Sequence, residues 1–188
     1  MDSLRTMRSS LRSLKVVSED DLNFLKDECT LVESPLLALE SLYLWGSLDA
    51  LPNWVTSLTN LTKLSLTSTR LGADAVEALG TLPNLIQLSL FEGAFKEEER
   101  LCFSAESFKS LKLLHLRGFS LGSVVFEIGA MPCLERALLS EVGQISGIEN
   151  LVGLKTIQLH RCSADVENLV KQAVEAHPNH PELIIIKQ

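Results

Sequence analysis

The hexapeptide Leu61-Thr-Lys-Leu-Ser-Leu66 follows the pattern L-x-x-L-x-L, and this pattern recurs through almost the whole 188-residue chain. Further copies, some of them weaker or partial, begin at Leu11, Leu39, Leu85, Leu111, Leu134, Leu154 and Leu183. Successive copies begin 20 to 29 residues apart. Residues 1–10 precede the first copy and are expected to be an N-terminal tail or the remnant of a preceding repeat.

This pattern, repeated at this interval along the chain, is the signature of leucine-rich repeats, in which each repeat adds one short strand to a parallel sheet. Side chains alternate along a strand, so Leu64 and Leu66 face the core while Lys63, Ser65 and Thr67 face outward. A single repeat cannot cover its own leucines, so the repeats must stack. The sequence predicts one α/β domain over residues 1–188. It is a solenoid of about seven to eight repeats, with a curved parallel concave sheet, irregular convex loops and short helices.

Between the strands, the sequence predicts turns and short helices. The acidic run after Ser18 favours a helix N-terminus there, with Leu22 and Leu25 facing inward. Pro52 predicts a turn rather than a helix over residues 51–55. A short helix is expected over residues 73–79, ended by Gly80, and a longer one over residues 164–177, capped by Ser163. The predicted inward stripe of the longer helix is Val166, Leu169, Val170, Ala173 and Val174.

Many leucine-rich repeats carry an asparagine three residues after the sixth position of the pattern, where its side chain bonds backbone of the neighbouring repeat. No asparagine occupies that position in this chain. The residues found there are Ser47, Thr69, Gly93, Phe119, Val142 and Cys162. We therefore expect the polar ladder along the stack to be largely absent.

The composition limits the possible partners and compartments. The chain has 17 basic and 24 acidic residues, a formal net charge of −7, which argues against nucleic-acid binding by the whole surface. No stretch approaches the roughly 20 apolar residues of a membrane span, and no signal peptide precedes the repeats. The four cysteines form no C-x-x-C pair and are expected to be reduced and mostly buried. These features predict a cytoplasmic protein.

The outward positions of the strands carry a charge bias that the composition hides. Over the first seven copies their charged residues are Lys15, Lys63, Arg117 and Arg136, with no acid among them. Aromatic and aliphatic side chains share these positions, and tyrosine, tryptophan and arginine are frequent anchors of protein interfaces. The alternative is a set of ordinary exposed side chains on a sheet. The predicted protein-binding residues of the concave face are Tyr43, Trp45, Lys63, Phe91, Leu113, His115, Arg117, Arg136, Leu138 and His160.

No sequence motif supports catalysis. The chain lacks the phosphate-loop, dinucleotide, zinc-protease and nucleophile-elbow patterns. The histidines of His177-Pro-Asn-His180 have no second ligand pair nearby, so a helix-ending loop is the better interpretation. His115 and His160 lie two repeats apart, too far for one metal ion. The sequence therefore predicts no enzyme, no cofactor, no metal site and no small-molecule substrate.

Several stretches together resemble the C-terminal repeats of plant nucleotide-binding, leucine-rich-repeat disease resistance proteins of the coiled-coil type. The matching stretches are Gly46-Ser-Leu-Asp-Ala-Leu-Pro-Asn-Trp-Val55, Leu82-Pro-Asn-Leu-Ile-Gln-Leu-Ser-Leu90, Phe108-Lys-Ser-Leu-Lys-Leu-Leu114, Gly129-Ala-Met-Pro-Cys-Leu-Glu135 and Gly147-Ile-Glu-Asn-Leu-Val-Gly-Leu-Lys155. The resemblance covers nearly the whole chain from about Leu11.

The resemblance implies a recognition module that binds a pathogen effector, a guarded host protein or the receptor's own nucleotide-binding module. No Gly-Lys-Ser or Gly-Lys-Thr phosphate loop occurs, so the chain cannot itself switch with ATP. It is expected to be a fragment, an excised domain or a truncated relative. Two alternatives remain: a substrate adaptor of a ubiquitin ligase, for which residues 1–10 are too short to form the helical F-box segment, and a non-signalling scaffold or remnant.

Overall fold

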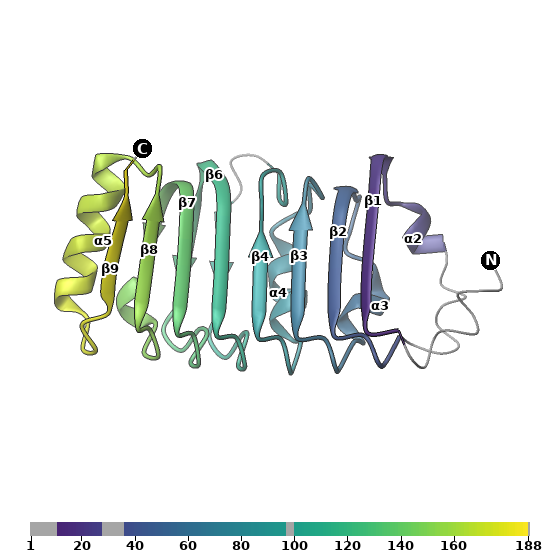
Figure 1. Ribbon diagram of the computed structural model, residues 1–188, viewed down its shortest axis with the longest axis horizontal. Helices are drawn as coiled ribbons and strands as arrows, with labels where there is room; N and C mark the ends of the chain where they lie inside the picture. Colours follow the sequence, from purple (N-terminus) through teal and green to yellow (C-terminus); the bar gives the residue numbers. More distant parts are fainter. Residues whose placement is uncertain (1–10, 28–35, 97–99, 188) are drawn as a thin grey trace.

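The computed structural model describes residues 11–27, 36–96 and 100–187. The expected N-terminal tail (residues 1–10) lies outside this part of the chain. One parallel sheet runs along the whole described molecule in the order β1-β2-β3-β4-β6-β7-β8-β9 (Figure 1). These strands are β1 (Ser13–Asp21), β2 (Ser41–Ser47), β3 (Lys63–Thr67), β4 (Gln87–Leu90), β6 (Leu113–Phe126), β7 (Arg136–Ser146), β8 (Thr156–His160) and β9 (Glu182–Ile186). The eight strands correspond to the eight copies of the leucine pattern.

The register aligns the same pattern position in every repeat. Leu64 pairs with Leu42 on one side and with Leu88 on the other. Leu64 is 1% exposed, whereas Lys63 beside it is exposed to solvent. The predicted alternation of inward leucines and outward polar residues is therefore confirmed. Stacking buries the leucines of neighbouring repeats against each other, which a single repeat could not do.

The last repeat begins earlier than the leucine pattern predicts. Leu183 pairs with Ile157, which is the fourth position of its own repeat, and Ile185 pairs with Leu159. His180, not Leu183, therefore occupies the first position of the eighth repeat. The histidine there is exposed and has a positive φ of 43°. The missing leucine at this position explains why the sequence pattern alone placed the repeat wrongly.

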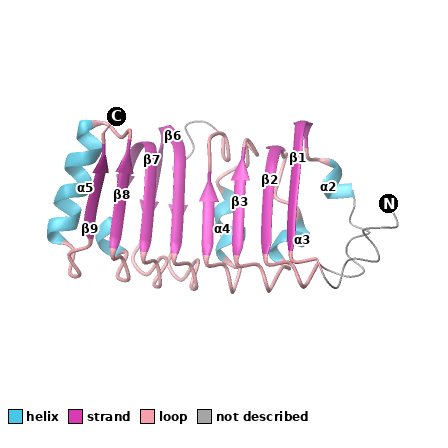
Figure 2. Cartoon of the chain, viewed as in Figure 1, coloured by secondary structure: helices cyan, strands magenta, loops and turns pink. Residues whose placement is uncertain are grey.

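Short helices lie behind the sheet, on its convex side, or at its two ends in Figure 2. They are α2 (Phe24–Asp27), α3 (Asn53–Thr56), α4 (Asp74–Gly80), the 3-10 turn η2 (Ile148–Asn150) and α5 (Ala164–Ala176). The expected helix after Ser18 is wrong, because β1 continues to Asp21, which pairs with Ser47 of β2. The expected turn after Pro52 is also wrong, since Pro52 instead precedes the single helical turn α3. Leu22 and Leu25 are buried as predicted.

Helix α5 largely follows the prediction. The Ser163 side chain accepts a hydrogen bond from the Val166 backbone N–H, so it caps the helix as expected. Val166 and Val170 are buried, and Ala173 and Val174 pack against the core. Leu169, predicted to face inward, is 52% exposed. The buried stripe is therefore narrower than the apolar pattern indicated.

A second parallel ladder lies on the convex side of repeats four to six. Strand β5 (Arg100–Phe103) pairs with the end of β6, Ser123 to Phe126, and Ser123 to Val125 pair with β7 from Gln144 to Ser146. The core beneath it is aromatic: Phe103 stacks on Phe126 at 5.3 Å and meets Phe108 edge-on at 5.6 Å. Strand β6 runs without interruption through Arg117–Gly122, and its pairing with β7 shifts register between Phe119 and Ser123.

Side chains bond the backbone of neighbouring repeats where the chain enters each strand. Asn84 Nδ2 donates to the Thr59 carbonyl at 2.8 Å, and Ser110 Oγ donates to the Pro83 carbonyl at 2.6 Å. Asn60 makes the equivalent bond to Leu37, and Asn179 makes it to Val152. All four donors directly precede the first position of a repeat. A ladder of side-chain bonds therefore links the repeats, but at a position other than the one at which the sequence predicts it to be largely absent.

The position that holds asparagine in many leucine-rich repeats carries only partial substitutes in this chain, as expected. Thr69 is fully buried, and its hydroxyl donates to the Ala94 carbonyl at 2.7 Å. The Cys162 thiol lies 3.8 Å from the Leu139 carbonyl. Of the three cysteines in the described residues, Cys133 is exposed and Cys102 and Cys162 are half-buried, and all three are free thiols. The expectation of mostly buried cysteines is wrong for these three.

Candidate protein-binding face

The outward positions of the eight strands form three rows across the sheet. The row at position three contains Ser13, Ser41, Lys63, Gln87, Leu113, Arg136, Thr156 and Glu182. The row at position five contains Lys15, Tyr43, Ser65, Ser89, His115, Leu138, Gln158 and Ile184. At position seven the predicted residues are Trp45 on β2, Phe91 directly after β4, Arg117 on β6 and His160 on β8. All ten predicted residues thus lie on one face, in separate groups.

The first group lies on β1 and β2. The Lys15 ammonium nitrogen lies 4.9 Å from the centroid of the Tyr43 ring, which is a cation–π geometry. Val17 is 49% exposed and pairs with Trp45. Tyr43 and Trp45 are half-buried by their neighbours in the sheet. This end of the face therefore offers apolar and aromatic surface with one cation already over a ring.

The second group is built around Phe91, between β4 and β6. The Phe91 and His115 rings meet edge-on with centroids 4.9 Å apart. Arg117 Nε lies 2.9 Å from the Glu92 carboxylate, so this cation has a carboxylate partner within the chain. Burial of the imidazole and, to a lesser extent, the charge of Arg117 lower the pKa of His115 below its ordinary value. His115 is therefore held toward its neutral form, packed against an aromatic ring.

Lys63 and Arg136 differ from the other two cations. Both are exposed, and within the described residues neither forms an ion pair with an acidic side chain. Between them in the same row lie Gln87 and Leu113, both half-buried. Leu138 pairs with His115 and is also half-buried. The unpaired positive charges therefore flank a partly apolar strip.

Small hydroxyl side chains separate the two aromatic groups. Ser65 and Thr67 on β3 lie between the β2 aromatics and the Phe91 group, with Ser89 next to Ser65 on β4. Ser65 Oγ and Thr67 Oγ1 are shielded from solvent and have no hydrogen-bond partner among the described residues. The centre of the face therefore consists of short, weakly polar side chains, with larger side chains on both sides.

Strand β9, the last strand of the sheet, changes the charge pattern predicted for this face. Glu182 pairs with Thr156, so an acidic side chain does occupy position three of the last repeat. The misplaced start of that repeat had hidden it. Ile184 and Ile186 are 37% and 38% exposed at positions five and seven. Beside them, His160 pairs with Ser140 and Ile186 and lies two strands from His115, as predicted.

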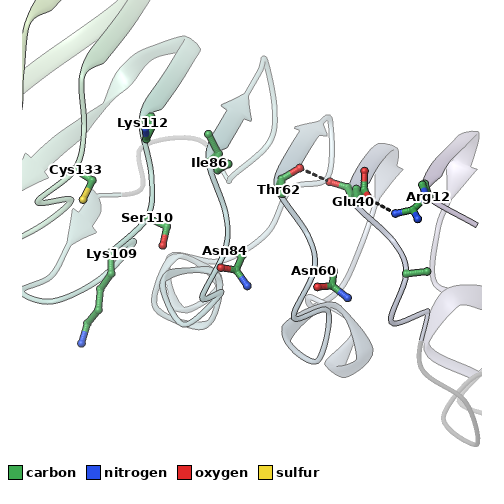
Figure 3. A pocket seen from close by; sticks show the side chains of 11 residues that line it. Arg12, Glu40, Asn60, Thr62, Asn84, Ile86, Lys109, Ser110, Lys112 and Cys133 are labelled. Atoms are coloured by element: carbon green, nitrogen blue, oxygen red, sulfur yellow. Dashed lines mark hydrogen bonds and ion pairs between the residues drawn. The ribbon is translucent and has the colours of Figure 1, made fainter.

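The flank where the chain enters the strands carries its own ion pairs. Glu135 lies between Lys112, at 3.6 Å, and Lys155, at 2.9 Å. The hydrogen bond and charge of Lys155 lower the pKa of Glu135 below its usual range. An open pocket of about 740 Å³ follows this flank across several repeats (Figure 3). Its lining consists of Arg12, Ala38, Glu40, Asn60, Thr62, Asn84, Ile86, Lys109, Ser110, Lys112 and Cys133.

The remaining candidate groups serve the fold. His177 is fully buried; its Nε2 lies 3.1 Å from the Leu151 carbonyl and its Nδ1 accepts from the Asn179 N–H. Across the described residues, no cluster of three or more histidine, cysteine, aspartate or glutamate side chains is arranged to hold a metal ion. In the same part of the chain, no helix has the length and apolar character needed to cross a membrane.

Comparisons with known proteins agree with this geometry. The model of the leucine-rich repeat region family matches residues 1–183. Over 163 residues the chain is 31% identical to disease resistance protein RPM1 of Arabidopsis thaliana, covering 82% of this chain and 17% of that protein. It is 33% identical to disease resistance protein RGA4 of Oryza sativa subsp. japonica over 176 residues, covering 90% and 16%. Against disease resistance protein Pik-2 of the same rice it is 28% identical over 188 residues, covering 84% and 18%.

The chain spans about a sixth of the length of these relatives. The repeats, their parallel sheet and the family match all lead to one assignment, and the relatives agree with the resemblance stated from the sequence. The chain belongs to the leucine-rich repeat family, and its similarity is to the leucine-rich repeat part of plant disease resistance proteins.

Proposed function

We propose that this chain is the recognition module of a plant immune receptor and that it binds protein through the concave face of its sheet. The partner is a pathogen effector, a guarded host protein or the receptor's own nucleotide-binding module. The module acts in the cytoplasm, by binding rather than by catalysis. It requires no cofactor and uses no nucleic acid or small-molecule substrate. The disease resistance relatives support this assignment.

One observation carries the proposal: the charge of the concave face is opposite to that of the chain. The formal net charge is −7, yet positions three, five and seven of the first seven repeats hold lysine and arginine and no acid. The acids Glu19 and Asp21 lie beyond these positions, at the end of β1. Aromatic side chains share these positions, and arginine and aromatic residues are enriched among the anchors of protein interfaces. A basic and aromatic face suits a protein partner with acidic and apolar groups.

The test is partner capture with matched surface variants. The tagged chain is expressed in infected and uninfected leaves, and captured proteins are identified by mass spectrometry. We expect Trp45→Ala and Arg136→Glu to reduce capture of the specific partner, because both side chains lie on the concave face. The control is Lys171→Glu, which makes the same charge change on the exposed part of α5.

The outcomes separate the alternatives. Capture of an effector, a host target or a nucleotide-binding module that depends on the concave face supports the proposal. Equal capture by the concave variants and the control would contradict the assigned face. Recovery of ubiquitin-ligase components would favour the adaptor, and no specific capture would favour the scaffold.

A further inference from the structure

The two unpaired cations of the concave face lie in one row at a defined separation. Lys63 pairs with Gln87, Gln87 with Leu113, and Leu113 with Arg136. Lys63 and Arg136 are therefore three strands apart, which corresponds to about 14 Å in the direction of the backbone hydrogen bonds. Both are exposed, and within the described residues no acidic side chain neutralises either.

The other cations of the face are already engaged. Arg117 is bonded to Glu92, and Lys15 lies over the Tyr43 ring. An incoming carboxylate at Arg117 has to compete with Glu92. At Lys63 or Arg136 it gains a new ion pair without displacing one. The structure therefore favours Lys63 and Arg136 as the first points of contact for acidic side chains.

The distance between Lys63 and Arg136 indicates which backbone conformation of a partner could place an acidic side chain at each of them. In an extended chain the residues i and i+4 lie on the same side and are about 14 Å apart, at 3.4 Å per residue. In an α-helix the same distance requires about nine residues, and nine residues are two and a half turns, which places the second side chain on the opposite face. The spacing therefore fits an extended segment and not a helix.

The side chains between the cations define the middle of the segment. Residue i+2 of an extended segment faces the same way as i and i+4 and lies near Gln87 and Leu113. Leu113 is half-buried, with His115 and Leu138 close to it in the sheet. An aliphatic side chain at i+2 removes more of this apolar surface from water. Beyond Arg136 the row ends in Glu182, which repels a further acid.

We propose that the concave face binds an extended protein segment with two acidic residues four positions apart and an aliphatic residue midway between them. The segment crosses the strands from Lys63 to Arg136. This inference rests on the proposed function, because it specifies the partner of the same face. It adds the conformation of the partner segment, the spacing of its acidic residues, and Lys63 and Arg136 as the residues that bind them.

The test uses two synthetic peptides of identical composition and the whole chain. Acetyl-Ser-Glu-Ser-Leu-Ser-Glu-Ser-amide has its acids four positions apart, and acetyl-Ser-Glu-Leu-Ser-Glu-Ser-Ser-amide has them three apart. Affinities are measured by NMR titration of the isotope-labelled chain at low salt. The first peptide is expected to bind up to about fivefold more tightly, the range of one exposed ion pair. The difference should shrink at high salt, which screens exposed charges.

Variants locate the effect. Lys63→Glu and Arg136→Glu should each abolish the difference between the peptides, whereas Lys171→Glu should preserve it. A peptide with lysine in place of both glutamates should bind the Lys63→Glu, Arg136→Glu double variant better than the unmodified chain. Equal affinities for the two isomeric peptides, or no binding of either, would overturn the proposed spacing. If partner capture still depends on the concave face, that result refutes only the spacing and not the proposed function.

Discussion

Replacing Cys133 with asparagine is expected to stabilise the chain, because it fills a gap in the ladder at the strand entries. Cys133 directly precedes the first position of the sixth repeat, where Asn60, Asn84 and Ser110 stand in three earlier repeats (Figure 3). Those three side chains each donate to a backbone carbonyl of the preceding repeat. Cys133 is an exposed free thiol and makes no such bond among the described residues.

The magnitude follows from the bonds that the neighbouring repeats make. By analogy with Asn84 and Thr59, the new amide should donate to the carbonyl of Lys109, two residues before the start of the previous repeat. A neutral hydrogen bond contributes a net of about 0.5–1.5 kcal/mol, and exposure at this edge favours the lower half of that range. For a chain of this size, about 1 kcal/mol corresponds to roughly 2–4 °C in Tm.

Thermal and urea unfolding followed by circular dichroism would measure the change. The matched control is Cys133→Ala, which removes the thiol without supplying a donor, so the difference between the two variants isolates the hydrogen bond. Asn84→Ala should show the reverse effect, a loss of about 1 kcal/mol. The reasoning is refuted if asparagine and alanine at position 133 give the same stability while Asn84→Ala is destabilising.

Three further predictions address facing, titration and backbone strain. Leu64→Ala should cost about 2–5 kcal/mol, whereas Lys63→Glu should stay within about 0.5 kcal/mol; equal losses in urea unfolding would contradict the facing assignment. Because the pKa of His115 is lowered by folding, the unfolded chain binds a proton more readily. The stability that the chain gains from keeping His115 neutral should be complete above about pH 6.5 and should decline below that pH. His115→Gln should flatten this part of the pH profile of the urea midpoint. Gly147→Ala should lose at least about 2 kcal/mol, since a Cβ there would lie 2.0 Å from the Phe126 carbonyl oxygen at a φ of 81°. Gly129→Ala, with a similar φ of 85° and only an ordinary contact of 4.0 Å to the Ala105 Cβ, should lose clearly less in the same assay.

The leucine pattern predicted the strands and their facing because both depend on a local two-residue period. The family resemblance and the Ser163 cap likewise depend on short stretches of sequence. The extension of β1 over Ser18–Asp21 did not follow from local preference. Three acids after a serine favour a helix start, but pairing with β2 as far as Ser47 supplies backbone hydrogen bonds that the acids cannot outweigh.

The side-chain hydrogen bonds at the strand entries had a signal in the sequence. Asparagine precedes the first leucine in Thr59-Asn-Leu61 and in Pro83-Asn-Leu85, at the same place in both repeats. The charge pattern of the face was predictable only where the repeats were aligned correctly. Glu182 was missed because His180 replaces the first leucine of its repeat. The Arg117–Glu92 pair was missed because Glu92 lies outside the seven-residue pattern.

The second ladder formed by β5, β6 and β7 divides the stack into zones of unequal stiffness. In repeats four to six the backbone is hydrogen-bonded to its neighbours on both the concave and the convex side. Helices and turns replace the convex strands in the outer repeats. Backbone amides of β6 should therefore exchange with solvent deuterium most slowly, and the two ends should open first. The Phe91 and His115 side chains lie on this rigid middle section, so a partner that contacts them has less motion to suppress when it binds.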